Sequence, residues 1–167
     1  MTTIKLKGNP VHTNGEPPAA GQKAPGFTLV DSDLKERSLK EFAGKRKLIA
    51  TVPSLDTQVC SLSAKKFNDA AKQHPEVMVI FVSADLPFAQ KRVCGVENLQ
   101  NIITLSMVRS KKFAEDLGLL IMDGPLQGVI ARSVFVLDGD DKILYREIVE
   151  EITQEPGYEK ALAALLG

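Results

Sequence analysis

The chain has no tryptophan, only two cysteines and only two histidines among its 167 residues. The cysteines, Cys60 and Cys94, are far apart in the sequence and form no Cys-x-x-Cys motif. The scattered cysteines and histidines also give no zinc-ligand spacing, so we expect no metal site. In a reducing cytosol two such cysteines remain free thiols. A bond between them there is more often catalytic or redox-sensing than structural.

An excess of charge of either sign is also missing, as are long hydrophobic runs. The 21 basic and 21 acidic residues leave a formal net charge of zero, which argues against a general nucleic-acid or anionic-lipid binder. The longest strictly apolar run, Val77 to Val82, is far too short to cross a bilayer. The first residues contain no uninterrupted apolar block after their charges and do not resemble a secretory signal. We therefore expect a cytoplasmic protein without membrane or nucleic-acid partners.

The length fits a single domain, residues 1–167, with a proper core. Near the start, the alternating "IKLKG" beside "TNG" predicts a β-hairpin. Strand patterns are expected within residues 27–31, 47–53, 76–85 and 101–107, helical patterns within 38–46, from 59 onward, and within 86–99, 111–119 and 157–167, and a second hairpin within 128–149. This order predicts an α/β, thioredoxin-like fold: a central mixed sheet flanked by helices, with an N-terminal hairpin. A fold by itself assigns no function.

The stretch "TVPSLDTQVC" brings Pro53, Thr57 and Cys60 between an apolar strand and an amphipathic helix. A lone cysteine is commonly a small buried hydrophobe, and that interpretation of Cys60 remains open. The first turn of a helix, however, stabilises a thiolate through its unpaired N–H groups and its dipole. The crevice beyond the carboxyl ends of strands is also the usual place for a site in such sheets. Cys60 is therefore a candidate nucleophile.

The two neighbours of Cys60 in this motif have alternative interpretations. The hydroxyl of Thr57 can face the thiolate or an oxygen bound beside it, or it can serve as a helix N-cap. Pro53 can shield the thiolate from water, or it can simply end the strand.

The pattern Pro-x-x-x-Thr-x-x-Cys resembles the active-site loop of the peroxiredoxins. The resemblance runs in register over essentially the whole chain and is to the thiol peroxidase subgroup of atypical two-cysteine peroxiredoxins. The segments that carry it are "GNPV", "FTLV", "FAGKRK", "PSLDTQVC", "SADLPFAQ" followed by "CG", "ITLS", "DGPLQG" followed by "AR", and "EITQEP".

This resemblance implies a role for each matching residue. Cys60 matches the peroxidatic cysteine, which attacks a hydroperoxide as thiolate and becomes a sulfenic acid. Thr57 matches the hydroxyl that binds the peroxide, Pro53 the shielding residue, and Arg132 the cation supplied by a distant strand. An arginine inside so apolar a strand is costly without a partner, which supports a role for Arg132 independently. Its alternative is a strand-end salt bridge.

Cys94 matches the resolving cysteine, which implies an intramolecular Cys60–Cys94 disulfide after oxidation. Each cysteine is predicted to lie on its own helix, and we expect the reduced fold to hold their Cα atoms beyond the roughly 4.4–6.8 Å that a disulfide needs. Local unwinding around Cys60, around Cys94, or around both would then be required, and Gly95 is a plausible weak point.

The resemblance also implies thioredoxin as reductant, hydrogen peroxide and alkyl hydroperoxides as substrates, no bound cofactor, and a homodimer. Arg109 and Lys112 are either surface charges or dimer contacts. Three alternative functions remain. One is a general disulfide reductase, although this chain lacks the second cysteine near Cys60 that such an enzyme requires. The others are a redox-sensing module without turnover and a structural domain with two buried cysteines.

Overall fold

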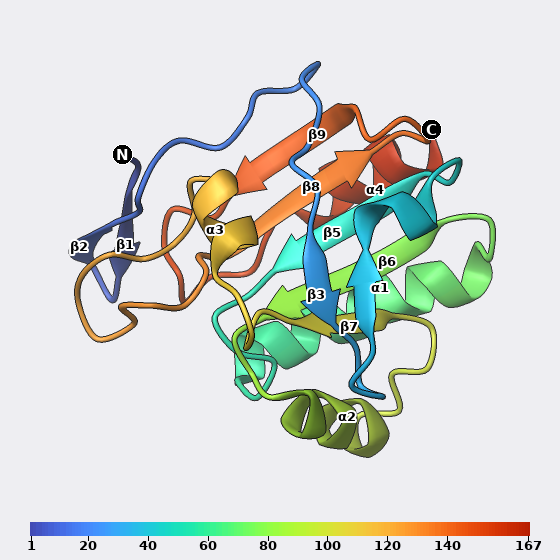
Figure 1. Cartoon of the computed structure of the whole chain (residues 1–167), viewed down its shortest axis with the longest axis horizontal. Helices are drawn as coiled ribbons and strands as arrows, with labels where there is room; N and C mark the ends of the chain where they lie inside the picture. The colour runs from blue at the N-terminus through green and yellow to red at the C-terminus, as the bar shows by residue number, and fades with distance from the viewer.

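The computed structural model describes all 167 residues and is built on a seven-stranded mixed sheet with the strand order β4-β3-β7-β6-β5-β8-β9 (Figure 1). The strands are β3 (Thr28–Val30), β4 (Glu36–Ser38), β5 (Lys47–Thr51), β6 (Met78–Ser83), β7 (Ile103–Ser106), β8 (Ser133–Leu137) and β9 (Ile143–Ile148). β5, β6 and β7 run parallel, and the remaining pairs are antiparallel. The predicted mixed α/β sheet is confirmed.

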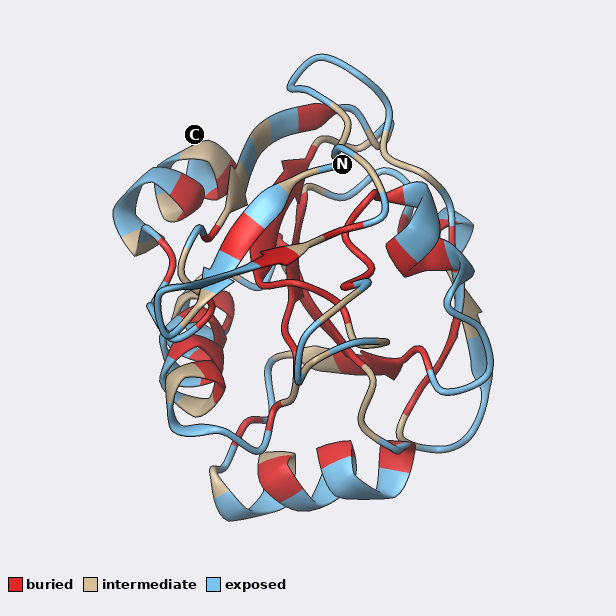
Figure 2. Cartoon of the chain, turned by 90° about the vertical axis from the view of Figure 1, so that its left-hand side faces the viewer, coloured by how far each residue is buried: buried red, intermediate tan, exposed pale blue.

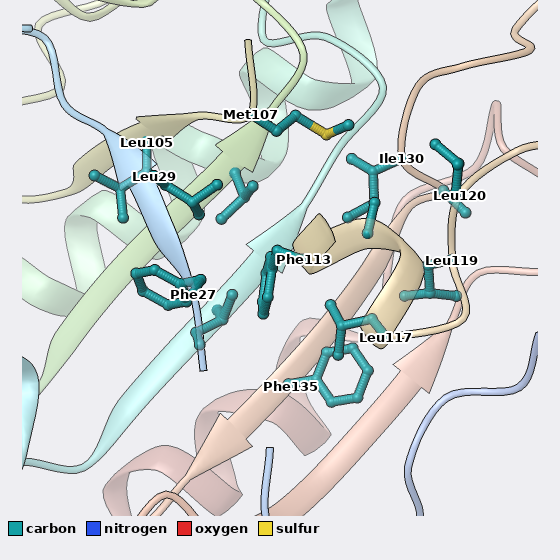
Figure 3. Close-up of a cluster of buried hydrophobic side chains, with 14 of the residues drawn as sticks. Phe27, Leu29, Leu105, Met107, Phe113, Leu117, Leu119, Leu120, Ile130 and Phe135 are labelled. Carbon is teal, nitrogen blue, oxygen red and sulfur yellow. The ribbon is translucent and has the colours of Figure 1, made fainter. Parts of the chain in front are cut away.

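Helices cover both faces of the sheet. They are the 3-10 helix η1 (Leu39–Phe42) and the α-helices α1 (Gln58–Gln73), α2 (Pro87–Val96), α3 (Lys112–Asp116) and α4 (Tyr158–Leu166). Figure 1 shows α3 in front of the sheet and α4 behind it. One buried cluster joins η1, α3 and one sheet face, and Figure 3 shows Phe27, Phe113 and Phe135 within it. A second cluster joins α1, α2 and α4 to the opposite face.

The middle of strand β5 is apolar without alternation because the strand is covered on both faces of the sheet. Ile49 packs into the cluster on one face, whereas Leu48 and Ala50 pack into the cluster on the other. All five residues of β5 are buried, as expected for a strand that is covered on both sides. In Figure 2 the strands at the centre are buried along most of their length, while the helices are buried mainly on their inner sides.

The predicted N-terminal hairpin is present as β1 (Thr3–Leu6) and β2 (Asn9–His12). Its two turn residues, Lys7 and Gly8, have φ values of 51° and 82°, the left-handed conformations that a tight hairpin turn of the favoured twist requires. The backbone N–H of Ile152 donates to the carbonyl of Lys5 at 2.9 Å. This contact holds the hairpin beside the segment that follows β9.

Some predicted boundaries were wrong. The strand β4 was missed because its three polar residues, one exposed and two half-buried, carry no apolar pattern. The helices expected within 38–46 and 111–119 are the short η1 and α3, since Gly44 and Gly118, with φ of 84° and 71°, lie shortly after them and favour termination. Arg132 lies directly before β8 and not inside a strand. No helix combines the length and the apolar character needed to span a membrane.

Candidate active site

Cys60 lies in the first turn of α1 and its side chain is completely buried. β5 ends at Thr51, and an irregular loop carries the chain through the buried Pro53 to the start of the helix at Gln58. The sulfur therefore sits at the positive end of a 16-residue helix, beyond the carboxyl end of a central parallel strand. The complete burial of Cys60 agrees with a packing role. Its side chain, however, also has a polar contact that a simple buried hydrophobe would not have.

That contact comes from Arg132, whose side chain is 4% exposed. Its Nη1 donates a hydrogen bond to the Sγ atom of Cys60 at 3.0 Å, and its Nε donates to the carbonyl oxygen of Ile152 at 2.9 Å. Arg132 forms no salt bridge with a carboxylate, so the strand-end salt bridge is not observed. A buried guanidinium with sulfur as its side-chain partner stabilises negative charge on that sulfur.

Thr57 is the N-cap of α1. Its hydroxyl oxygen accepts the backbone N–H of Cys60 at 3.4 Å, and the hydroxyl donates to the carbonyl of Ser54 at 3.4 Å. The capping interpretation is thus what the structure contains. Both bonds are long, and the side chain of Thr57 is solvent-exposed, so its hydroxyl is also available to a small molecule beside it.

Three of the residues singled out by the sequence meet in one cleft. Pro53, Thr57 and Arg132 all line a cavity of about 500 Å³. Cys60 is completely buried and does not itself line this cavity, but Arg132 is the lining residue whose Nη1 contacts its sulfur. The other lining residues come from the N-terminal hairpin, the first turn of α1 and four loops: Leu6, Ser54, Gln58, Val59, Ala84, Asp85, Leu126, Val129, Ile152 and Thr153. Several of them are aliphatic, so the cleft offers apolar walls beside a single buried cation.

Cys94 lies elsewhere, on α2, and is half-buried. Both cysteines are free. Burial raises the pKa of the Cys94 thiol, while a hydrogen bond with Thr104 acts in the opposite direction. Cys94 lines a separate cavity of about 240 Å³ that also includes Thr104 and Arg37. Cys60 and Cys94 therefore lie in different surroundings.

Arg109 and Lys112 are placed away from both cysteines. Arg109 pairs with Glu36 at 3.4 Å and Lys112 with Asp116 at 2.8 Å, and both cations are well exposed. These are surface ion pairs of the kind that contribute little to stability. No group of three or more histidine, cysteine, aspartate or glutamate side chains gathers anywhere in the structure.

Two features of the site were missed by sequence reasoning. The carbonyl of Ile152, which fixes the Arg132 guanidinium, is a backbone group and leaves no sequence signal. Asp85 binds the loop between β5 and α1, and it lies within the segment "SADLPFAQ". A polar residue two positions after the end of a buried strand was the available signal.

The comparisons with known proteins agree with this geometry. A sequence model of the Redoxin family matches residues 19–162. The thiol peroxidase of Leptospira interrogans serogroup Icterohaemorrhagiae serovar copenhageni (strain Fiocruz L1-130) is 49% identical over 166 residues, covering 98% of this chain and 97% of that protein. The thiol peroxidase of Staphylococcus aureus (strain COL) is 48% identical over 165 residues, covering 98% of each.

Solved structures show the same fold. A peroxiredoxin-like protein from Aquifex aeolicus superposes with a TM-score of 0.93 at 41% identity, covering 99% of this chain and 96% of that one. A thiol peroxidase from Chromobacterium violaceum superposes with a TM-score of 0.90 at 23% identity, covering 98% and 95%, a likeness of fold alone. The chain therefore belongs to the Redoxin family. Its identification as an oxidoreductase of the thiol peroxidase type, with the thioredoxin-like fold of the peroxiredoxins, is confirmed.

Proposed function

We propose that this thiol peroxidase reduces hydrogen peroxide and organic hydroperoxides, with Cys60 as the peroxidatic nucleophile. The observation that carries the proposal is the 3.0 Å hydrogen bond from the buried Arg132 guanidinium to the Cys60 sulfur. The Cys60 thiolate attacks one oxygen of the peroxide, an S–O bond forms and the O–O bond breaks. The departing oxygen takes a proton and leaves as water or an alcohol, and Cys60 becomes a sulfenic acid.

In this mechanism Arg132 stabilises the thiolate first and then the charge that develops on the departing oxygen. Thr57, which lines the same cleft, hydrogen-bonds the peroxide, and the buried Pro53 keeps water away from the sulfur. The aliphatic walls of the cleft support alkyl hydroperoxides as substrates beside hydrogen peroxide.

The role of Thr57 can be separated from its capping function. Thr57→Val removes the hydroxyl with little change in shape, and we expect it to lower both the rate of Cys60 oxidation and the free energy of unfolding, the latter by about 1 kcal/mol. Thr57→Ser keeps the oxygen and should retain most of both. Rapid-quench trapping of sulfenic acid and denaturant unfolding measure the two effects. Unchanged oxidation kinetics in Thr57→Val would leave Thr57 as a helix cap alone.

Cys94 is the proposed resolving residue. Its thiol attacks the sulfenic sulfur of Cys60, an S–S bond forms, and hydroxide leaves and is protonated to water. Since the two cysteines have different surroundings, we propose that α1, α2 or both unwind locally before this step, with Gly95 as the weak point. Reduced thioredoxin then returns the disulfide to two thiols, and no bound cofactor takes part.

The reductant and the resolving step are tested together by following peroxide consumption with thioredoxin, thioredoxin reductase and NADPH. We expect multiple turnovers for the wild type. For Cys94→Ser we expect one oxidation per Cys60, followed by loss of turnover, because no disulfide is available to thioredoxin. Glutathione in place of thioredoxin is the control. Sustained thioredoxin-dependent turnover by Cys94→Ser would exclude Cys94 as the resolving cysteine, and no turnover by the wild type would favour a redox-sensing module.

We also propose that the whole chain, residues 1–167, acts as one domain in the cytoplasm, where thioredoxin keeps thiols reduced.

A homodimer is supported by two exposed apolar side chains close to the cleft. Leu86 is 54% exposed and Phe88 is 68% exposed, and both follow Asp85 in the loop and helix after β6. Such neighbouring exposed apolar side chains are typical of a contact surface.

A further inference from the structure

Only one side chain from elsewhere in the fold forms hydrogen bonds with the loop between β5 and α1, which leads to Cys60. The carboxylate of Asp85 accepts a hydrogen bond from Ser54 Oγ and another from the backbone N–H of Leu55, both at 2.7 Å. The other side-chain hydrogen bonds of this loop are internal, such as that from the Thr57 hydroxyl to the Ser54 carbonyl. Val52 and Leu55 pack the loop into the core, and the Asp85 carboxylate supplies the polar contacts that fix the stretch between them and the N-cap of α1.

Asp85 is itself fixed to the ends of two parallel strands. Ser83, at the end of β6, donates its hydroxyl to the same carboxylate at 2.7 Å. Ser106, at the end of β7, donates its hydroxyl to the backbone carbonyl of Asp85. The carboxylate thus accepts three hydrogen bonds, two from the loop and one from the sheet.

The chain of hydrogen bonds continues to the helix that carries Cys94. Gln90 on α2 is completely buried, and its Nε2 donates to Ser83 Oγ and to the carbonyl of Leu105, each at 3.0 Å. Its Oε1 is buried without a hydrogen-bond partner, which lowers the net stability of this anchor. Gln90 lies one helical turn before Cys94. One polar chain, Gln90–Ser83–Asp85, therefore joins the Cys94 helix to the Cys60 loop.

We propose that Asp85 is a positioning residue that holds the Cys60 loop in its peroxide-reactive form, and that Ser83 links release of this loop to release of α2. This inference rests on the proposed peroxidase cycle. While the bonds are intact, Thr57 and Cys60 stay at the cleft beside Arg132. When they break, the Cys60 loop loses its outside anchor and α2 loses one of its own, which favours disulfide formation with Cys94.

The test measures the two chemical steps separately in Asp85→Asn. Rapid-quench trapping of sulfenic acid in a Cys94→Ser background gives the rate constant of Cys60 oxidation, which we expect to fall about tenfold through misplacement of the loop. With Cys94 present, the first-order rate constant for conversion of the Cys60 sulfenic acid to the disulfide should rise about threefold. This step does not depend on the peroxide concentration, and it is faster because the intact loop conformation around Cys60 is less favoured. Opposite changes in two rate constants are not produced by a partly unfolded sample, which loses reaction amplitude instead.

Asp138→Asn is the matched control, because Asp138 accepts two backbone hydrogen bonds in the turn between β8 and β9. Ser83→Ala removes the hydrogen bonds of Ser83 with Gln90 and with the Asp85 carboxylate, but it keeps both Asp85 bonds to the loop. It should speed disulfide formation with little change in oxidation, and it decides the matter if Asp85→Asn does not fold. The proposal would be overturned if Asp85→Asn and Ser83→Ala both had wild-type rate constants. It would also be overturned if the rate constants of Cys60 oxidation and of disulfide formation fell together in Asp85→Asn. A wild type that forms neither sulfenic acid nor disulfide would instead refute the peroxidase cycle itself.

Discussion

Cys60→Ser is expected to abolish peroxide reduction while leaving the fold intact. The serine hydroxyl is nearly isosteric with the thiol and fits the same buried position. It stays protonated near neutral pH, however, and does not attack peroxide. The loss in rate should be about 10³-fold or more, as for removal of other covalent nucleophiles. The measurement is peroxide consumption per mole of protein under single-turnover conditions, together with a denaturant unfolding curve.

The control for Cys60→Ser is Cys94→Ser, which retains the proposed nucleophile and should consume one peroxide per chain. If Cys60→Ser consumed peroxide as fast as the wild type, another group would be the nucleophile. Cys60 would then be the small buried hydrophobe that its complete burial also allows.

The second large effect is expected for Arg132→Met. The substitution removes the hydrogen bond to the Cys60 sulfur and the positive charge, and it leaves the carbonyl of Ile152 without its donor. We expect Cys60 oxidation to slow by about 10²–10³-fold, the usual cost of losing a preorganised donor to developing charge. Arg132→Lys should be nearly as slow, because one ammonium cannot reproduce two directed donors from a planar guanidinium.

Arg46→Met is the matched control for Arg132→Met. Arg46 is half-buried and donates to the carbonyl of Ala164 at 3.2 Å, but it makes no contact with Cys60. Oxidation of Cys60 should therefore proceed at the wild-type rate in this variant. Equal rates for Arg132→Met and Arg46→Met would show that the 3.0 Å contact with sulfur has no part in the reaction.

The sequence predicted the central elements well because they obey strong local rules. β5 and β6 are apolar runs that end at polar or proline positions, and α1 has a regular apolar face after a threonine cap. The N-terminal hairpin was predicted from the alternating "IKLKG" beside "TNG", and the structure places its turn at Lys7 and Gly8 in left-handed conformations. The missed strand β4 lacks such a signal, since its residues have no apolar pattern and it forms by pairing with β3. The end of α3 does have a local signal in Gly118, whose left-handed backbone also packs against the backbone of Glu16.

At the site, the sequence identified the reactive types but not the connections between them. A motif of proline, threonine and cysteine placed three groups on the loop and the first helical turn after β5, and the structure adds that Pro53 and Thr57 share their cleft with Arg132. The Arg132–Cys60 contact joins residues that are distant in the sequence, so no local pattern could give its geometry. The Asp85 bonds were invisible for the same reason, because they join the carboxyl ends of neighbouring parallel strands.

Peptide-mapping mass spectrometry after addition of one equivalent of cumene hydroperoxide to the fully reduced protein tests the proposed Cys60–Cys94 cycle most directly. Wild type, Cys60→Ser and Cys94→Ser are compared. We expect a Cys60–Cys94 disulfide in the wild type within seconds, sulfenic acid at Cys60 in Cys94→Ser, and no reaction in Cys60→Ser. A Cys60 that remains a thiol in every sample would contradict the account, and the motif around it would be only a strand end followed by a helix cap.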